Sequence, residues 1–228
     1  MENELIDALN GKDKSKVIFF DVDTQHDFMQ QAFCDDKNNV IKGALYINNA
    51  ESIIHNLEDL TMYAEKNSIR ILGSVDRHFK SDVELISNGG QFPEHCMDGT
   101  YGQRKIRHSS PKNVLFIENR QYAPGELEEI LNNHRNTYFE KQTTDVFDNP
   151  NIEKTLKILK PEIAVVYGVA TDYCVKNAAI GLRKHGLEVY LVEDSIKGIT
   201  KETGDAALAE MEGIGIKKIL AYEITGKR

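Results

Sequence analysis

The sequence predicts an α/β fold with a mostly parallel sheet that is covered by helices on both faces. Two observations predict it. Short runs rich in β-branched and aromatic residues alternate with amphipathic stretches along the chain, and residues 163–193 form a clear strand–helix–strand unit. Parallel neighbours need such crossovers, and the helices then cover the sheet. Because no repeat or low-complexity linker interrupts the pattern, we expect one domain over residues 1–228.

The first half of the chain begins with charged residues at 1–15, which we expect to form a peripheral extension. VIFFDV at 17–22 predicts a buried strand. In residues 50–66 apolar side chains recur every three or four positions, which predicts a helix with one apolar face. RILGSV at 70–75 is the second expected strand, and VLFIE at 114–118 is a weaker third.

The second half repeats the alternation of helix and strand. The same spacing rules predict each element, and proline ends one of the helices. The expected elements are a helix at 127–131, a strand at 137–141, a helix at 152–160 ending before Pro161, a strand at 163–169, a helix at 172–184, a strand at 187–193, a helix at 203–211 and a strand at 217–222.

The composition limits the classes of partner. The 228 residues include 28 Lys plus Arg against 36 Asp plus Glu, a net charge of −8. This balance argues against a nucleic-acid or anionic-membrane binder, which would show a basic patch. No apolar run is long enough to span a bilayer, and the charged start lacks a signal-peptide core. We therefore expect a cytoplasmic protein with a small-molecule substrate, and leave a homo-oligomer open.

Cys174 is the first candidate for chemistry. The three cysteines have no CxxC spacing, so they predict neither a disulfide framework nor a thiolate zinc site. Cys174 follows a strand and lies in the first turn of a helix, where the helix dipole would lower the pKa of its thiol. Free N–H groups in the same turn could bind an oxyanion. A buried cysteine packing at helical spacing is an equally good interpretation of this position alone.

Asp23 and Lys141 end two other strands, in FFDVDTQHDF and YFEKQTTDVF. Either residue alone is more often a solvated strand end. In parallel sheets, however, the carboxyl ends of the strands meet at one edge, where chemistry is usually found. A carboxylate, a lysine and a cysteine at three strand ends therefore predict a shared site.

A third cluster follows the strand at 70–75. Asp76 and His78 are two residues apart, and His95 lies further along in FPEHC. Imidazole and carboxylate groups suit a divalent metal such as zinc, iron or manganese, and the absence of cysteine ligands favours an open site. Glu84 and Asp82 are further candidates. An ordinary polar loop is the alternative.

The motifs together resemble one family. FFDVDTQHDF, YFEKQTTDVF, GVATDYCV, DRH and FPEHC are similar to the motifs of isochorismatase-like cysteine hydrolases, and most similar to those of their nicotinamidase branch. The resemblance runs from about residue 16 to 222. It implies a six-stranded, mostly parallel sheet in three layers.

The resemblance also implies roles for the site residues. Asp23 would be the general base, Lys141 its partner and Cys174 the nucleophile. The backbone N–H groups of Ala170 and Cys174 would form the oxyanion hole, next to a cis peptide bond between Val169 and Ala170.

The cofactor and substrate follow from the same resemblance. It implies a divalent metal, zinc first, and cleavage of nicotinamide to nicotinate and ammonia through a cysteine thioester, a step of NAD salvage. Two aromatic rings would stack on the substrate, although Phe92 stands where the family often has tryptophan. The residues concerned are Phe28 and Phe92 for the substrate, and Asp76, His78, His95 and, least fixed, Glu84 for the metal.

Three alternatives remain. The nearest keeps the chemistry but changes the substrate to another small amide or ureido compound. A magnesium-dependent phosphatase of the haloacid dehalogenase type is suggested by Asp21 and Asp23 after an apolar strand, but Gln25 departs from that motif and Cys174 is left unexplained. The third is a family member that binds a ligand without turning it over.

Overall fold

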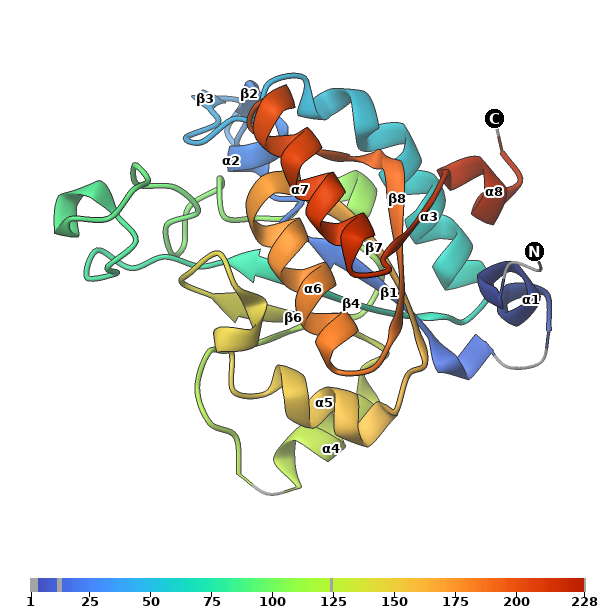
Figure 1. Ribbon diagram of the computed structural model, residues 1–228. Coiled ribbons are helices and arrows are strands. Elements are labelled where there is room, and N and C mark those ends of the chain that lie inside the picture. Colours follow the sequence, from blue (N-terminus) through green and yellow to red (C-terminus); the bar gives the residue numbers. More distant parts are fainter. Residues whose placement is uncertain (1–3, 12–13, 124, 228) are drawn as a thin grey trace.

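A seven-stranded parallel sheet forms the centre of the computed structural model, which describes residues 4–11, 14–123 and 125–227 (Figure 1). The strand order is β5-β6-β4-β1-β7-β8-β9, and each pair of neighbours is parallel. The α/β class is as the sequence predicts, but the sheet has one strand more than the six that the resemblance implies. The strands are β1 (Val17–Val22), β4 (Arg70–Asp76), β5 (Val114–Ile117), β6 (Asn136–Lys141), β7 (Ile163–Val169), β8 (Glu188–Lys197) and β9 (Lys217–Ile219).

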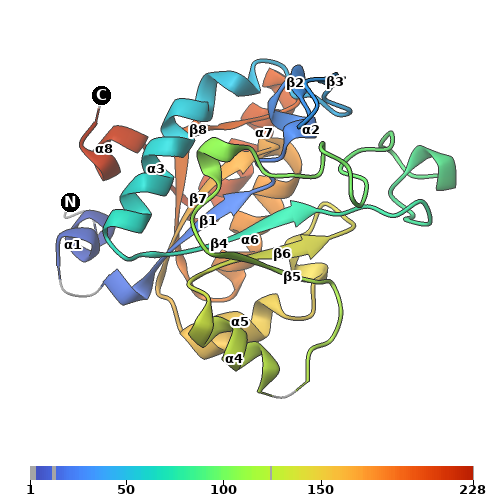
Figure 2. The same ribbon diagram turned by 180° about the vertical axis from the view of Figure 1, so that it is seen from behind.

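Two layers of helices cover the sheet, as a comparison of Figures 1 and 2 shows. Side chains of α1, α3 and α8 join one buried apolar cluster, and those of α4, α5, α6 and α7 join the other. The central strands β1, β4, β6 and β7 are buried on both faces because each face packs against one of these helix layers. The helices are α1 (Glu4–Asn10), α2 (His26–Met29), α3 (Ile54–Lys66), α4 (Glu126–Asn133), α5 (Ile152–Leu159), α6 (Lys176–Lys184), α7 (Lys201–Gly213) and α8 (Ala221–Thr225).

The register of the central strands determines which side chains meet at the carboxyl edge. Val22, the last residue of β1, pairs with Ser74 of β4 and with Gly168 of β7. In the next pair of strands, Asp76 lies opposite Lys141. The residue after β1 and the last residues of β4, β6 and β7 therefore lie side by side at one end of the sheet.

The chain ends differ from expectation. Of the expected peripheral extension, residues 1–3, 12 and 13 lie outside the described residues, and α1 buries Leu5 and Leu9 in the core beside α3 and α8. The strand expected at 217–222 was too long, because β9 ends at Ile219 and α8 begins at Ala221.

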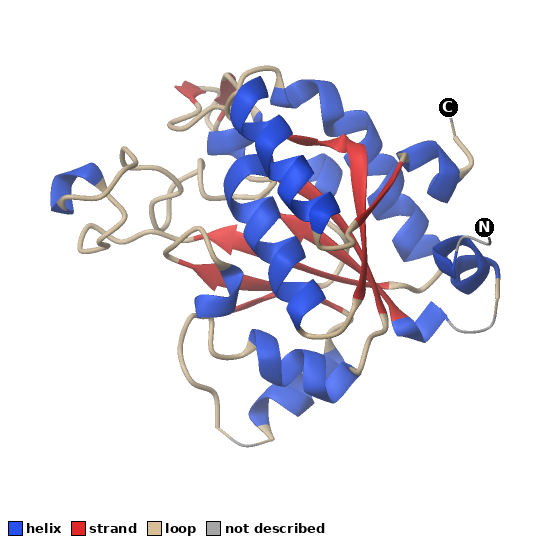
Figure 3. Cartoon of the chain, viewed as in Figure 1, coloured by secondary structure: helices blue, strands red, loops and turns tan. Residues whose placement is uncertain are grey.

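Two connections near the carboxyl edge could not be read from apolar periodicity. A small antiparallel hairpin forms between β2 (Ala32–Cys34) and β3 (Val40–Lys42), whose strands are too short to show a pattern. Part of the β4–β5 loop (residues 77–113) protrudes from the body, and Figure 3 shows that most of the loop is irregular. None of the helices in the described ranges has the length and apolar character needed to span a membrane.

Candidate active site

Three side chains predicted from separate strand ends meet below a cavity. The ammonium group of Lys141 lies 2.9 Å from a carboxylate oxygen of Asp23 and 3.3 Å from the sulfur of Cys174. Asp23 and Lys141 are fully buried, and Cys174 is nearly so. A base, a cation and a thiol in direct contact form the arrangement that nucleophilic catalysis by cysteine requires.

Local structure fixes the orientation of Asp23. Its backbone φ is 47°, in the left-handed region that aspartate tolerates better than most residues. Its N–H donates to the Ser74 carbonyl, and the Ser74 hydroxyl donates to carboxylate oxygen Oδ1 at 2.7 Å. Oδ2 is left for Lys141 and for the thiol. Nothing in the pattern RILGSVD distinguished Ser74 from an ordinary strand residue.

Lys141 is held between two carboxylates. It also forms a short ion pair with Asp76, the residue opposite it in the sheet. Burial disfavours the charged form of Lys141, but Asp23 and Asp76 outweigh burial and raise its pKa well above its ordinary value. For Asp23 burial prevails, and its pKa is raised despite the attraction of Lys141. Lys141 therefore stays protonated while Asp23 becomes a better proton acceptor than an exposed aspartate.

Cys174 lies in a π-helical turn (Thr171–Val175) between β7 and α6. Ala170 is the N-cap of this turn, and its carbonyl accepts from the N–H groups of Tyr173 and Val175. The Val169–Ala170 peptide bond is cis, at the position where the resemblance implies one. Ala170 and Cys174, whose N–H groups were expected to bind an oxyanion, both line the cavity.

The expected lowering of the Cys174 pKa was wrong. Burial raises the pKa of the thiol well above its ordinary value, and the positive charge of Lys141 only partly offsets this effect. A thiolate that lies away from water is costly, and this cost outweighs the nearby positive charge. The thiol is therefore neutral at rest and needs a base, which the adjacent Asp23 provides.

Asp76, His78 and His95 converge beside this trio. Their ligand atoms lie within 4.8 Å of one another, and all three side chains are buried. Oδ2 of Asp76 is 3.4 Å from Nε2 of His95 and 3.7 Å from Nε2 of His78. The oxygen and both ring nitrogens thus face a common point.

The other ring nitrogens have acceptors of their own. Nδ1 of His95 lies 2.7 Å from the Pro93 carbonyl, and Nδ1 of His78 lies 3.1 Å from the Asp82 carboxylate. Proton donation from Nδ1 leaves the Nε2 lone pairs free, as in most histidine metal ligands. Nε2 of His78 is buried without a hydrogen-bond partner among the described residues, which a metal ion would satisfy. The donor set therefore fits a divalent metal.

Glu84 lies at the edge of this cluster. One of its carboxylate oxygens is 3.4 Å from Nε2 of His78, and the side chain lines the cavity. Asp82, the other acidic candidate, contacts the far side of the same imidazole and therefore supports the ligand instead. Glu84 is thus placed to act as a fourth ligand or to bind a water on the metal.

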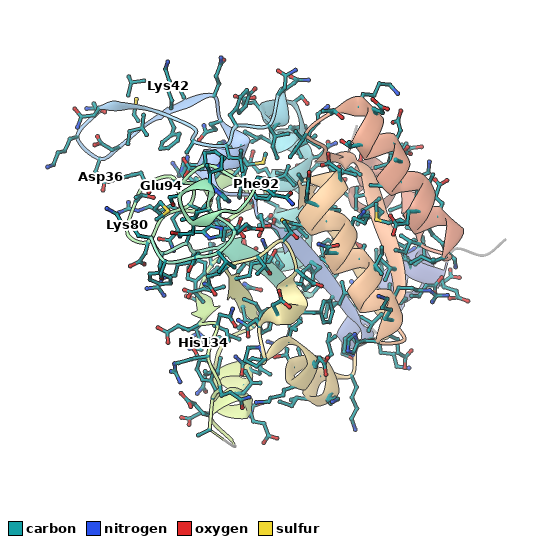
Figure 4. The ribbon with its side chains drawn as sticks, turned by 60° about the vertical axis from the view of Figure 1, so that its left-hand side comes forward. Asp36, Lys42, Lys80, Phe92, Glu94 and His134 are labelled. Carbon is teal, nitrogen blue, oxygen red and sulfur yellow. The ribbon has the colours of Figure 1, made fainter. Side chains whose placement is uncertain are left out.

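A cavity lies above these groups. Phe28 and Phe92 both line it, and their ring centres are 5.4 and 6.0 Å from that of His95. Phe92 also makes an edge contact with Tyr173 at 5.5 Å. Figure 4 places Phe92 on the inner side of the protruding loop, whereas Lys80 lies toward its outer edge.

Several residues of the cavity wall were missed from the sequence. They are mainly apolar side chains from connections without periodicity, so only their place in the fold reveals them. These residues are Leu45, Ile47, Thr144, Tyr173 and Ile199.

A protein-family model matches most of the chain. Residues 22–221 match the model of the isochorismatase domain. The chain belongs to the isochorismatase family. As an isochorismatase-like hydrolase it is not a phosphatase of the haloacid dehalogenase type, and that alternative is set aside.

Nicotinamidases and a pyrazinamidase are among the proteins to which the chain is similar. The chain is 23% identical to the nicotinamidase of Saccharomyces cerevisiae over 217 residues, which cover 79% of this chain and 88% of the relative. It is 21% identical over 187 residues to the nicotinamidase of Escherichia coli, covering 75% and 83%. Among solved structures, the pyrazinamidase of Pyrococcus horikoshii in complex with zinc is 25% identical, with a TM-score of 0.72 and coverage of 90% and 99%.

Proposed function

We propose that this isochorismatase-family protein is a nicotinamidase, which hydrolyses nicotinamide to nicotinate and ammonia. The observation that carries the proposal is the contact of Lys141 with both Asp23 and Cys174 at the base of a cavity. Residues of the metal-ligand cluster and two aromatic rings line the same cavity. The similarity to nicotinamidases supports the choice of substrate.

The first half of the reaction uses Asp23 and Cys174. Asp23 accepts the thiol proton, and the thiolate sulfur attacks the carboxamide carbon. The N–H groups of Ala170 and Cys174 stabilise the negative charge on the carboxamide oxygen. Asp23 then donates the proton to the departing nitrogen, ammonia leaves, and the acyl group remains on sulfur as a thioester.

The second half releases the acid. Asp23 takes a proton from water, the resulting hydroxide attacks the thioester carbon, and the C–S bond breaks. The sulfur leaves as a thiolate and regains the proton from Asp23. Lys141 remains positively charged throughout. It stabilises the carboxylate of Asp23 when that group is ionised and the thiolate of Cys174 when the sulfur is negative.

The remaining cavity residues orient the substrate. Asp76, His78 and His95 would hold the metal, with Glu84 beside them, and Phe28 and Phe92 would enclose the ring. A bound zinc ion would supply a Lewis acid for the ring nitrogen. We further propose that residues 1–228 form one domain around this site. We also propose that the enzyme is cytoplasmic and acts in NAD salvage.

Removal of the metal is expected to weaken substrate binding more than folding. Three protein ligands leave coordination positions open, unlike a closed structural zinc site, so purified protein should hold about one metal per chain. Treatment with a chelator should raise KM for nicotinamide, and zinc should restore it. Metal analysis, steady-state kinetics and thermal melting before and after chelation check this. If metal-free protein has an unchanged KM, the cluster of Asp76, His78 and His95 is an ordinary group of polar loop residues and not a metal site.

The choice of substrate is tested by a panel of amides. We expect kcat/KM to be highest for nicotinamide and pyrazinamide, lower for benzamide, which has no ring nitrogen, and lowest for an aliphatic amide. Phe92→Ala should raise KM for nicotinamide by roughly 2- to 10-fold, because stacking contributes about 0.5–1.5 kcal/mol beyond burial. Preference for benzamide, for an aliphatic amide or for a ureido compound would reject nicotinamide but retain the cysteine hydrolase. Absence of turnover with every amide would favour a ligand-binding role.

A further inference from the structure

Gln25 and Asp27 follow Asp23 closely in the chain, yet in the described structure neither side chain forms a hydrogen bond or ion pair with Asp23, Lys141 or Cys174. Both side chains are nonetheless buried, with exposed fractions of 0% and 5%. A buried amide and a buried carboxylate are costly unless their polar atoms are satisfied. Their partners therefore indicate what they do.

Gln25 holds the backbone of the metal ligand Asp76. Its amide nitrogen donates to the carbonyls of Asp76 and Gln103, at 2.7 and 2.6 Å, and its oxygen accepts from the Asp76 N–H at 2.7 Å. All three bonds need a neutral amide in one orientation, since its nitrogen must donate twice and its oxygen must accept. Asp76 is thus fixed on both sides of its own Cα.

Asp27 joins two segments on the other side of the cluster. Its oxygen Oδ2 accepts from the N–H of Cys96 at 2.7 Å, and Oδ1 accepts from the N–H of Ala44 at 3.0 Å. Cys96 directly follows the metal ligand His95, and Ala44 directly precedes Leu45 of the cavity wall. A side chain at Gly102 would collide with this carboxylate, since a Cβ there would lie 2.2 Å from it.

We propose that Gln25 and Asp27 are positioning residues for the metal, and that Asp27 couples metal binding to the cavity wall at residues 43–47. This inference rests on the metal site of the proposed function. The two residues act through Asp76 and His95, whose separation determines whether a metal is held without rearrangement. Supporting residues of this kind typically contribute about 10- to 100-fold to metal affinity.

The zinc affinity of near-isosteric variants tests the proposal. In Asp27→Asn the side chain keeps one oxygen, so the N–H group of either Cys96 or Ala44 faces an NH₂ group and loses its acceptor. In Gln25→Met all three hydrogen bonds to the backbone are lost. We expect each variant to bind zinc about 10- to 100-fold more weakly than the wild type in competition with a chromophoric chelator. Each should also gain less in Tm when zinc is added.

Asp172→Asn is the matched control. Asp172 is also a buried carboxylate that accepts from a backbone N–H, that of Ile199, and from the hydroxyl of Thr203, but it contacts none of the metal ligands in the described structure. This substitution should lower Tm without changing zinc affinity. Wild-type zinc affinity in folded Asp27→Asn or Gln25→Met, or an equal loss of affinity in Asp172→Asn, would overturn the proposal.

Hydrogen exchange of the wild-type protein decides the matter even where a variant does not fold. Zinc should slow amide exchange in residues 43–47 as well as around Asp76 and His95. It should leave residues 196–201, which include Ile199 of the cavity wall, unchanged. Protection limited to the ligand segments would contradict the coupling through Asp27. A wild type that binds no zinc at all would instead reject the metal site itself, so the two failures are distinguishable.

Discussion

Replacement of Cys174 with alanine is expected to reduce nicotinamide hydrolysis to background. No other nucleophile contacts Lys141 and Asp23 in the described structure, and a methyl group cannot form the thioester. Ammonia release measured at high enzyme concentration checks this, with thermal melting to show that the variant is folded.

The other two cysteines provide matched controls. Cys34 is exposed, and the buried Cys96 sulfur forms one long hydrogen bond of 3.9 Å, to the Gly102 carbonyl, within the described part of the chain. Cys34→Ala and Cys96→Ala should therefore retain most of the activity, since alanine keeps the Cys96 N–H that Asp27 accepts. Turnover by Cys174→Ala at a rate near that of the wild type would refute the proposed mechanism.

The second large effect is expected at the base. Asp23→Asn should lower kcat by about 10²- to 10⁴-fold, the usual contribution of a general base. The raised pKa of Cys174 leaves the thiol neutral at rest, and an amide at position 23 cannot remove its proton. The geometry should survive, because the asparagine oxygen can still accept from Ser74 and Lys141 retains Asp76.

A matched substitution separates the loss of a general base from the loss of a buried negative charge. Asp21 is another buried aspartate, on β1, and its carboxylate accepts from Thr24, Lys105 and Tyr138 without reaching the cavity. Asp21→Asn should lower Tm more than it lowers kcat, whereas Asp23→Asn should do the reverse. A folded Asp23→Asn protein with kcat close to that of the wild type would show that another group removes the thiol proton.

The sequence predicted that Asp23, Lys141 and Cys174 would meet because parallel strands impose a simple rule. Asp23, Lys141 and Cys174 each follow or end an apolar run, and in a parallel sheet the ends of such runs meet. Metal ligands could be proposed from Asp76, His78 and His95 because their chemistry is distinctive even within a loop. Residue type and strand position indicated that each group would gather, and the family resemblance implied the roles of its members.

The supporting residues could not be predicted in this way. Ser74 lies within a strand like any other small polar residue, and its bond to Asp23 depends on the pairing of β1 with β4. The roles of Gln25 and Asp27 depend on where the β4–β5 loop passes. The pKa of Cys174 was mispredicted because position in a helix can be read from the sequence, whereas the depth of burial depends on the whole fold.

The central claim is that an acyl group passes through Cys174, and hydroxylamine tests this most directly. A thioester can be attacked by hydroxylamine in place of water, so wild-type enzyme turning over nicotinamide should form nicotinohydroxamic acid. The hydroxamate should rise with hydroxylamine concentration at the expense of nicotinate, and Cys174→Ala should form neither product. Undiminished release of nicotinate by the wild type, with no hydroxamate at any hydroxylamine concentration, would contradict an acyl intermediate on Cys174.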